Sequence, residues 1–198
     1  MSVQTQALTP EERARALGHR GATVWITGLP ASGKSTLAGA VERTLVERGR
    51  PALRLDGDDL RDGLNGDLGF EASDRAENVR RTAHVARLLA EAGVVAIVAL
   101  VSPYAADRAL ARRLHTDASV PFLEVFVDTP LDECERRDPK GLYARARRGE
   151  LARLTGIDDP YEPPKQPNLT LRPGPVEALV RAVLDALTEL ELRMAARP

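Results

Sequence analysis

The 198-residue sequence predicts a three-layer α/β fold in which helices cover both faces of a mostly parallel sheet. Short apolar runs alternate with longer stretches of helical periodicity, a pattern typical of parallel strands joined by helical crossovers. A glycine-rich turn also joins the first apolar run to the first long helical stretch. We expect one domain over residues 1–198, because the Pro-rich segment 158–168 is too short to separate two domains.

Five apolar runs bounded by turn residues predict the strands. They lie at residues 22–27, 51–56, 94–101, 121–128 and, as an expected edge strand, 167–173. Amphipathic stretches predict helices at residues 33–49, 73–93, 103–115, 130–138 and 175–195. Ser73 or Asp74 is expected to cap the helix at 73–93. The basic segment that follows residue 138 is expected to be loop-like up to about residue 157.

Composition and charge exclude several classes of protein. The formal net charge of -1 gives no overall field that would attract nucleic acid or a membrane surface, so neither is expected as a partner. The single cysteine, Cys134, excludes an intramolecular disulfide and fits a reducing compartment. No apolar run approaches the roughly 20 residues of a membrane helix, and the first 21 residues lack the hydrophobic region of a signal peptide. We therefore expect a cytoplasmic protein.

Residues 28–35, GLPASGKS, match the pattern G-x-x-x-x-G-K-[ST] of an ATP- or GTP-binding loop. The match lies between a predicted strand and a predicted helix, as the motif requires. Its glycines let backbone N–H groups wrap around a polyphosphate. Lys34 can reach the β- and γ-phosphates, and the hydroxyl of Ser35 can ligate Mg²⁺. The sequence thus predicts a P-loop NTPase-type fold with these nucleotide-binding residues: Gly28, Leu29, Pro30, Ala31, Ser32, Gly33, Lys34, Ser35 and Thr36.

Two carboxylate positions follow predicted strands and compete for the roles of metal ligand and catalytic base. Asp128 ends the fourth strand, whereas Asp56 and Asp58 follow the second strand with Gly57 between them. Residues i and i+2 of an extended segment project to the same side. Phosphoryl transfer needs carboxylates beside Mg²⁺ and the attacking hydroxyl. We favour Asp56 and Asp58 for these roles and expect Asp128 to cap the helix that follows it.

Six segments, taken together and in this order, resemble the adenylylsulfate kinase family. They are WITGLPASGKST, DGDDLRDGLNGDLGF, DRAENVRR, VSPY, EVFVDTPLDECERRDPKGLYARARRGE and LTGIDDPYEPP, and the resemblance spans roughly residues 15–170. It implies a transferase of sulfate assimilation that uses ATP and Mg²⁺. Such an enzyme moves the γ-phosphate of ATP to the 3′-hydroxyl of adenosine 5′-phosphosulfate. The products would be 3′-phosphoadenosine 5′-phosphosulfate and ADP.

The resemblance assigns the catalytic and metal-binding roles to a small set of residues. The implied catalytic residues are Asp58, Asp56, Lys34 and Ser102, and the implied Mg²⁺ ligands are Ser35, Asp56 and Asp58. The family's serine at the position of Ser102 is often described as a phosphoserine intermediate. Because no general base is evident beside it in the sequence, we expect Ser102 to act as a serine of the acceptor pocket.

The resemblance also implies the residues that bind the two nucleotides. Arg61 and Arg75 correspond to family arginines, whose guanidinium groups suit phosphate and sulfate oxygens. Phe70 corresponds to a ring that stacks on the acceptor's adenine. Asn78 lies one helical turn beyond Arg75, on the same helix face. The implied acceptor-binding set is Asp58, Arg61, Phe70, Arg75, Asn78, Val101, Ser102, Lys140 and Leu142, and Arg137 is implied as a nucleotide contact.

The segment 136–153 is strongly basic, with seven Lys and Arg residues against two acidic ones, in a chain whose net charge is -1. A charge run of this kind is either a solvated helix face or a functional surface. The resemblance implies a mobile lid at about residues 138–157 that closes over the polyphosphate and the sulfate. Closure would exclude water, which competes as a phosphoryl acceptor. We favour the lid and expect several of these arginines to be solvated.

The sequence departs from the family pattern at Asp59, where the family usually has Asn. We favour a solvent-facing side chain that changes little; one facing the site would raise metal affinity or repel the sulfate. Two alternatives to the leading hypothesis are a P-loop kinase for another small hydroxylated acceptor, such as a sugar acid or a nucleoside, and a non-catalytic nucleotide-binding module. The resemblance implies a homodimer, and we expect any ATP sulfurylase partner to be a separate chain.

Overall fold

The computed structural model describes residues 7–195 and has a five-stranded sheet as its middle layer. The strand order is β2-β3-β1-β4-β5, and all neighbouring strands are parallel. The strands are β1 (Ala22–Thr27), β2 (Ala52–Asp56), β3 (Val95–Ala99), β4 (Phe122–Val127) and β5 (Leu169–Leu171). This sheet confirms the predicted fold class, including the edge strand. The single domain over 1–198 stays a prediction, since residues 1–6 and 196–198 lie outside the described residues.

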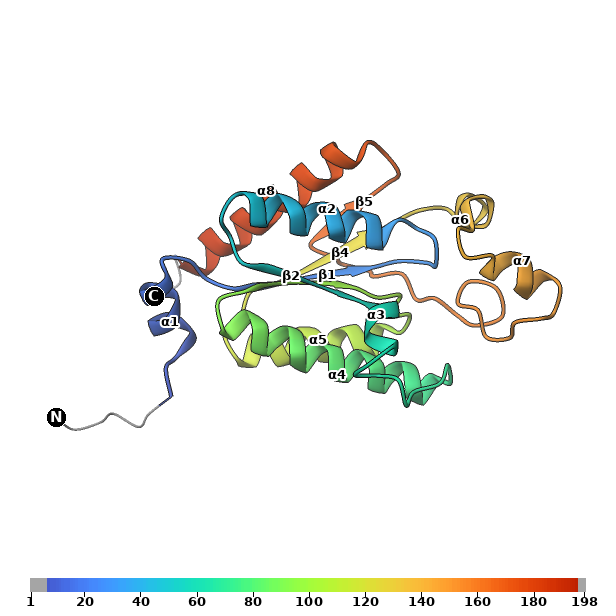
Figure 1. Ribbon diagram of the computed structural model, residues 1–198, viewed down its shortest axis with the longest axis horizontal. Coiled ribbons are helices and arrows are strands. Elements are labelled where there is room, and N and C mark those ends of the chain that lie inside the picture. Colours follow the sequence, from blue (N-terminus) through green and yellow to red (C-terminus); the bar gives the residue numbers. More distant parts are fainter. Residues whose placement is uncertain (1–6, 196–198) are drawn as a thin grey trace.

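Helices cover both faces of the sheet (Figure 1). α2 (Lys34–Glu47) and α8 (Val176–Ala195) pack together on one face, and α4 (Ala72–Glu91) and α5 (Ala105–Asp117) pack together on the other. α6 (Leu131–Arg137) and α7 (Leu142–Arg147) lie beyond the carboxyl ends of the strands, at the right of Figure 1. Among residues 7–195, no helix has the length and apolar character needed to cross a membrane.

Three helices were not expected from the sequence: α1 (Pro10–Leu17), α3 (Gly57–Arg61) and α7. α3 and α7 have only five and six residues, too few for a helical period to show in the sequence. The predicted cap of α4 is wrong by two residues or more, because the helix already begins at Ala72 with Glu71 at the capping position. Asp74 supports this start by accepting the backbone N–H of Glu71 at 3.3 Å.

The two faces of the sheet carry separate apolar cores. All six residues of β1 are buried, because helices cover both sides of this central strand. Alternate residues of a strand point to opposite faces. Val24 and Ile26 accordingly face α2 and α8. Trp25 faces α4 and α5, with its ring centroid 5.9 Å from that of Phe122.

A buried histidine joins α5 to β1. His115 Nδ1 donates to the carbonyl oxygen of Ala111 at 2.7 Å, since a carbonyl can only accept. Its Nε2 lies 2.8 Å from Thr23 Oγ1 and accepts from that hydroxyl. Burial lowers the pKa of His115 to about 4, so the ring is neutral in this site near pH 7.

One edge of the sheet is formed by β2, whose outer side meets no other strand. The backbone N–H of Arg54 in this strand donates instead to the carboxylate of Glu42 on α2, at 2.7 Å. β5 forms the opposite edge and has only three residues. The β2 edge is therefore partly occupied by the Glu42 side chain, and the β5 edge is short.

Candidate active site

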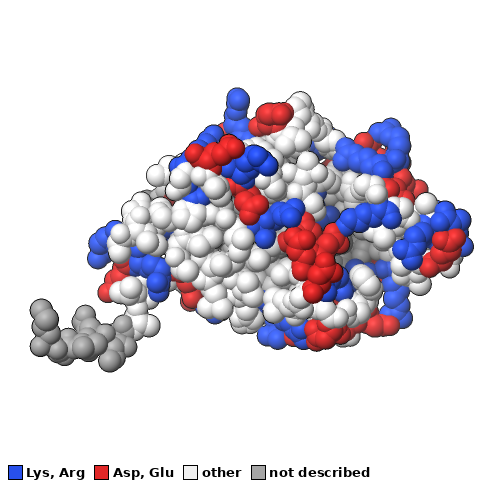
Figure 2. Space-filling model, viewed as in Figure 1, with Lys and Arg blue, Asp and Glu red and all other residues white. Residues whose placement is uncertain are grey.

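A cavity of about 640 Å³ opens at the carboxyl ends of the parallel strands, where open α/β sheets form their ligand sites. Five segments line it: the glycine-rich loop with the start of α2, the β2–α3 junction, the loop after β3, the start of α4, and the α6–α7 segment up to Thr155. Charged side chains of both signs gather on the side of the molecule where α3, α6 and α7 lie (Figure 2). The cavity thus combines residues from five parts of the chain.

The glycine-rich loop connects β1 to α2, and two of its positions require glycine. A Cβ atom at Gly28 would lie 2.7 Å from the carbonyl oxygen of Val127, and Gly33 has a left-handed φ of 105°. α2 begins directly at Lys34, so its unpaired N–H groups and the positive end of its dipole face the cavity. This arrangement can hold a polyphosphate.

Lys34 folds back onto this loop. Its Nζ donates to the carbonyl oxygen of Leu29 at 2.7 Å. Burial lowers the pKa of Lys34 to about 8, and the nearby carboxylates of Asp56 and Asp58 oppose that shift. A buried ammonium group with few protein partners is suited to an anionic ligand.

Six of the nine nucleotide-binding residues predicted in the loop line the cavity: Pro30, Ala31, Gly33, Lys34, Ser35 and Thr36. The other three residues lie behind the loop. Gly28 packs against β4, and Leu29 joins an apolar cluster under α6 and α7. Ser32 is buried, and its carbonyl oxygen accepts from Thr129 Oγ1 at 2.9 Å. These three residues shape the loop and do not form the cavity wall.

Asp56 and Asp58 both line the cavity. The prediction that an extended segment would bring them to the same side is wrong. The segment is not extended, because α3 begins at Gly57 and places Asp58 in its first turn. Asp56 caps this helix by accepting the N–H of Asp58 at 3.2 Å. The Asp56 side chain is buried, and its Oδ2 has no hydrogen-bond partner among residues 7–195. Asp58 is exposed at the cavity and pairs with Lys140.

The competing carboxylate, Asp128, lies outside the cavity, 4.0 Å from Arg172. Its predicted role as a helix cap is wrong, because α6 begins after Pro130 without a side-chain cap. Asp59 also lies outside the cavity wall and pairs with Arg54 at 3.1 Å. The structure therefore brings two of these four carboxylates, Asp56 and Asp58, to the glycine-rich loop.

All nine predicted acceptor-binding residues line this same cavity. Arg61 and Arg75 both approach Phe70, with guanidinium carbons 4.2 Å and 5.8 Å from the ring centroid. Arg61 Nη1 also donates to the carbonyl oxygens of Leu68 and Gly69, at 3.0 Å each. Two cations and an exposed aromatic ring therefore share one part of the wall. This chemistry suits a ligand with a planar group and negative charge.

Ser102 lies in the loop after β3 and is nearly fully buried. Its Oγ accepts from Trp25 Nε1 at 3.2 Å and donates to Thr27 Oγ1 at 3.0 Å. Its φ of 39° is unusual for a residue other than glycine. No carboxylate or imidazole of the described residues bonds to this hydroxyl. The hydroxyl therefore holds the loop after β3 against β1. A catalytic role for Ser102 stays a prediction.

The segment predicted as a lid, residues 138–157, contains α7 and contributes several residues to the cavity wall. Lys140 reaches Asp58, and Arg75 of α4 donates to the carbonyl oxygen of Arg153 at 2.6 Å. Three of the basic residues of segment 136–153 line the cavity: Arg137, Lys140 and Arg153. Three others form surface ion pairs with nearby glutamates: Arg136, Arg147 and Arg148. Part of the basic run therefore faces the cavity and part is solvated, and its role as a lid stays a prediction.

Comparison with known proteins places this arrangement in a family. The family model described as adenylylsulphate kinase matches residues 20–172. The chain belongs to the adenylylsulfate kinase family. It is 51% identical over 165 residues to the adenylyl-sulfate kinase of Saccharomyces cerevisiae. The aligned region covers 83% of this chain and 82% of that protein. It is 57% identical over 169 residues to the bifunctional enzyme CysN/CysC of Mycobacterium tuberculosis, covering 85% of this chain but only 28% of that relative's length.

Solved structures agree with this family assignment. The Mycobacterium tuberculosis APS kinase CysC, solved in complex with AMPPNP and APS, matches with a TM-score of 0.84 and 57% identity, over 85% of this chain and 98% of that one. A gluconokinase from Sinorhizobium meliloti matches with a TM-score of 0.56 and 15% identity over 89% of this chain, which shows a shared fold alone.

The structure adds cavity residues that reasoning from the family motifs missed. Tyr143 of α7 is buried, and its hydroxyl donates to the carbonyl oxygen of Pro30 in the glycine-rich loop at 3.0 Å. Arg153 and Thr155 close the wall behind it. Tyr143 is the sole aromatic residue of the basic segment 136–153, and this feature of the sequence could have indicated that it is buried at the site. Arg153 was counted only as one charge in the basic run.

Proposed function

We propose that this chain is an ATP-dependent adenylylsulfate kinase, which phosphorylates the 3′-hydroxyl of adenosine 5′-phosphosulfate. One observation carries the proposal, namely the composition of the single cavity at the carboxyl ends of the strands. A phosphate-binding loop, the carboxylates Asp56 and Asp58, and the cationic aromatic wall of Arg61 and Phe70 all line it. A polyphosphate donor and a planar, anionic acceptor can therefore meet beside two carboxylates.

Mg²⁺ fits the residues beside the phosphate loop. The buried Oδ2 of Asp56 has no hydrogen-bond partner among the described residues. Arg54 Nη1 lies 3.8 Å from it, an ion pair beyond hydrogen-bonding distance, so this oxygen can still ligate a metal. Residues 7–195 contain no group of three or more His, Cys, Asp or Glu side chains arranged to hold a metal ion. Mg²⁺ does not need one, since it is usually held by one or two carboxylates with phosphates and waters. We propose Ser35, Asp56 and Asp58 as the residues that would hold Mg²⁺, which would neutralise charge on the β- and γ-phosphates.

Asp58 is proposed to accept the proton of the 3′-hydroxyl while the oxygen of that hydroxyl attacks the γ-phosphorus. The new O–P bond forms while the bond to the β–γ bridging oxygen breaks, and ADP leaves. Lys34 stabilises the negative charge of the transferred group. Lys140, which contacts Asp58, holds the lid segment over the reacting groups and keeps water away from them.

Acceptor-dependent ADP release tests this proposal directly. The purified chain is mixed with ATP, Mg²⁺ and adenosine 5′-phosphosulfate, and ADP release is measured. Three control reactions replace the nucleotide sulfate with gluconate, with adenosine, or with no acceptor at all. We expect ADP release with the nucleotide sulfate and a background rate with the others. Equal release with gluconate or adenosine would favour a kinase for another hydroxylated acceptor. No acceptor-dependent release at all would leave only a nucleotide-binding module.

We further propose a cytoplasmic homodimer that uses the acceptor made by an ATP sulfurylase. These proposals rest on the family to which the chain belongs. A family relative from Thiobacillus denitrificans, 29% identical, is described as hexameric, so assemblies within the family differ. Light scattering after gel filtration measures the mass in solution. A mass of one or six chains would contradict the dimer.

A further inference from the structure

The loop between α3 and α4, residues 62–70, contains one buried side chain. This side chain belongs to Asn65, whereas Leu64 and Asp67 beside it are exposed. The Asn65 backbone N–H donates to the carbonyl oxygen of Leu60 at 2.8 Å, and its own carbonyl oxygen accepts from Leu68 at 3.1 Å. A polar side chain turned away from water costs free energy unless it is hydrogen-bonded. Asn65 Oδ1 is buried without a hydrogen-bond partner among residues 7–195, so the partner of its Nδ2 shows what the residue does.

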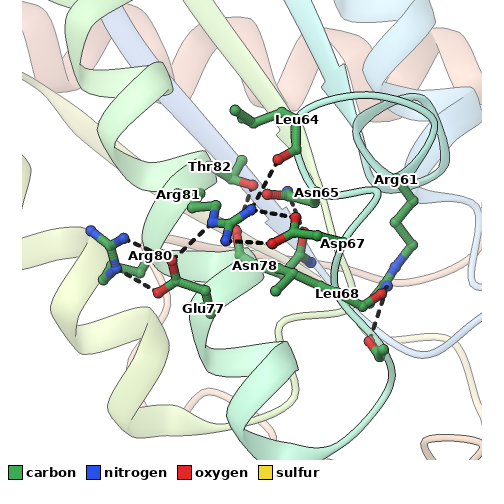
Figure 3. A network of polar contacts seen from close by, with 11 residues as sticks. Arg61, Leu64, Asn65, Asp67, Leu68, Glu77, Asn78, Arg80, Arg81 and Thr82 are labelled. Atoms are coloured by element: carbon green, nitrogen blue, oxygen red, sulfur yellow. Dashed lines mark hydrogen bonds and ion pairs between the residues drawn. The ribbon is translucent and has the colours of Figure 1, made fainter.

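That partner is a residue of the cavity wall. Asn65 Nδ2 donates to Asn78 Oδ1 at 2.6 Å, across 13 positions of the chain (Figure 3). Asn78 lies on α4 one turn after Arg75, and both line the cavity. Its Oδ1 is thus occupied, while its Nδ2 has no hydrogen-bond acceptor among residues 7–195 and is not sealed from solvent. The amide therefore offers its NH₂ group to a ligand.

We propose that Asn65 is a positioning residue for the anionic nucleotide acceptor. It holds the side chain of Asn78 at the cavity wall through this buried hydrogen bond, in an arrangement that leaves the NH₂ group of Asn78 to meet an oxygen of the acceptor. The two ends of an amide have nearly the same shape, so packing alone does not select one orientation. A donor to a charged oxygen binds strongly, whereas an inverted amide would place oxygen against oxygen. This role rests on the proposed function, because that function supplies the acceptor.

The loop has a separate attachment that does not involve the two asparagines. Arg81 of α4 forms a two-bond ion pair with Asp67, at 2.6 and 2.8 Å, and donates to the carbonyl oxygen of Leu64 at 3.1 Å (Figure 3). Glu77 holds the same guanidinium group by accepting from Arg81 Nε at 2.8 Å. Loss of the Asp67 pair loosens the loop and leaves the orientation of Asn78 alone. Asp67→Asn is therefore the matched control for changes at Asn65.

Asn65→Asp replaces the donor by a carboxylate of the same shape that only accepts. The amide of Asn78 then turns to donate to it and presents its carbonyl oxygen to the cavity. We expect the acceptor KM to rise about 10-fold or more at about pH 8.5. The ATP KM is expected to change little. Asp67→Asn is expected to change the acceptor KM by less than about threefold, as for surface ion pairs.

An unchanged acceptor KM in Asn65→Asp at about pH 8.5, or an equal rise in Asp67→Asn, would overturn the proposal. Should Asn65→Asp fail to fold, side-chain amide exchange measured by NMR on the unaltered protein decides instead. The NH₂ group of Asn65 should exchange slowly throughout, and that of Asn78 should slow only when adenosine 5′-phosphosulfate is added. The reverse order contradicts the proposal. Absence of acceptor-dependent ADP release in the unaltered protein would instead reject the proposed function.

Discussion

Asp56 and Asp58 are two positions apart, yet their surroundings differ. Asp56 is 5% exposed and fixed by its hydrogen bond to the start of α3, whereas Asp58 is exposed and paired with Lys140. A fixed, buried carboxylate suits a metal ligand. A carboxylate at an open cavity wall can meet a hydroxyl that arrives with the acceptor. Asp56 is therefore suited to metal binding alone, whereas Asp58 can also act as the base beside the metal.

Asp58→Asn is expected to lower kcat by about 10²-fold or more, because an amide cannot accept the hydroxyl proton. Acceptor-dependent ADP release at saturating substrates measures this effect. Asp59→Asn is the control, because Asp59 lies outside the cavity and its exposed ion pair with Arg54 contributes little. We expect Asp59→Asn to stay within about twofold of the unaltered protein. A similar loss in both variants would contradict the assignment of the base to Asp58.

Phe70→Ala is expected to raise the acceptor KM by about 10-fold, on the scale of base–aromatic stacking, with a small effect on kcat. The ring is 55% exposed although Arg61 covers part of it, so ring surface remains for a planar ligand. Leu64→Ala, an exposed apolar residue of the same loop, is the control and should leave KM unchanged. An unchanged KM in Phe70→Ala would remove the stacking role.

At the scale of elements, α7 and the glycine-rich loop are joined by one buried side chain. Tyr143 is 2% exposed, and its hydroxyl donates to the carbonyl oxygen of Pro30. Burial also raises the pKa of this phenol, so the group remains a donor. The segment over the cavity and the phosphate-binding loop therefore support each other.

Tyr143→Phe removes that donor and leaves the carbonyl oxygen of Pro30 without a partner in a part-buried site. We expect a loss of about 1–2 kcal/mol in the free energy of unfolding and a rise of about fivefold in the ATP KM. The acceptor KM should change less. Urea denaturation and initial-rate kinetics measure these effects. An unchanged ATP KM in a destabilised variant would mean that the contact supports only the fold.

Some elements were predictable from the sequence because their burial is continuous. β1, β3 and β4 are covered on both faces and therefore read as mostly apolar runs, with Thr23 and Thr27 in β1 and Glu124 in β4 as the polar residues. α3 lacks such a pattern, since it has five mostly polar residues and starts only because Asp56 caps it. This helix made the extended-strand argument for Asp56 and Asp58 wrong, although both reach the cavity.

Within the candidate site, residues that belong to a motif were predictable and those that support them were not. Lys34 and Phe70 were found because the P-loop pattern and the family resemblance name their positions. Asn65 and Tyr143 contact partners 13 and 113 positions away, and no local pattern reports such distances. Their importance follows from burial and hydrogen bonding, which only the fold supplies.

At the scale of the whole molecule, His115 links stability to pH. Its folded pKa of about 4 lies below the ordinary value of 6.5, so the unfolded chain binds the proton first as the pH falls. The contribution of neutral His115 to the free energy of unfolding is fully present above about pH 6.5. It is lost between about pH 6.5 and 4, and the total loss is about 3 kcal/mol. Urea denaturation at about pH 7.5 and pH 5 measures the loss. His115→Gln should flatten this dependence, and an identical slope in the variant would contradict it.

The hydrogen bond between Glu42 and the backbone of Arg54 has a consequence for crowded solutions. A strand from another copy that tried to extend the sheet at β2 would first have to displace this carboxylate. At the other edge, β5 offers three residues and is followed closely by Pro173. Neither side is a good template for growth. The protein is therefore protected against polymerising edge to edge into ribbons, even when many copies are close together.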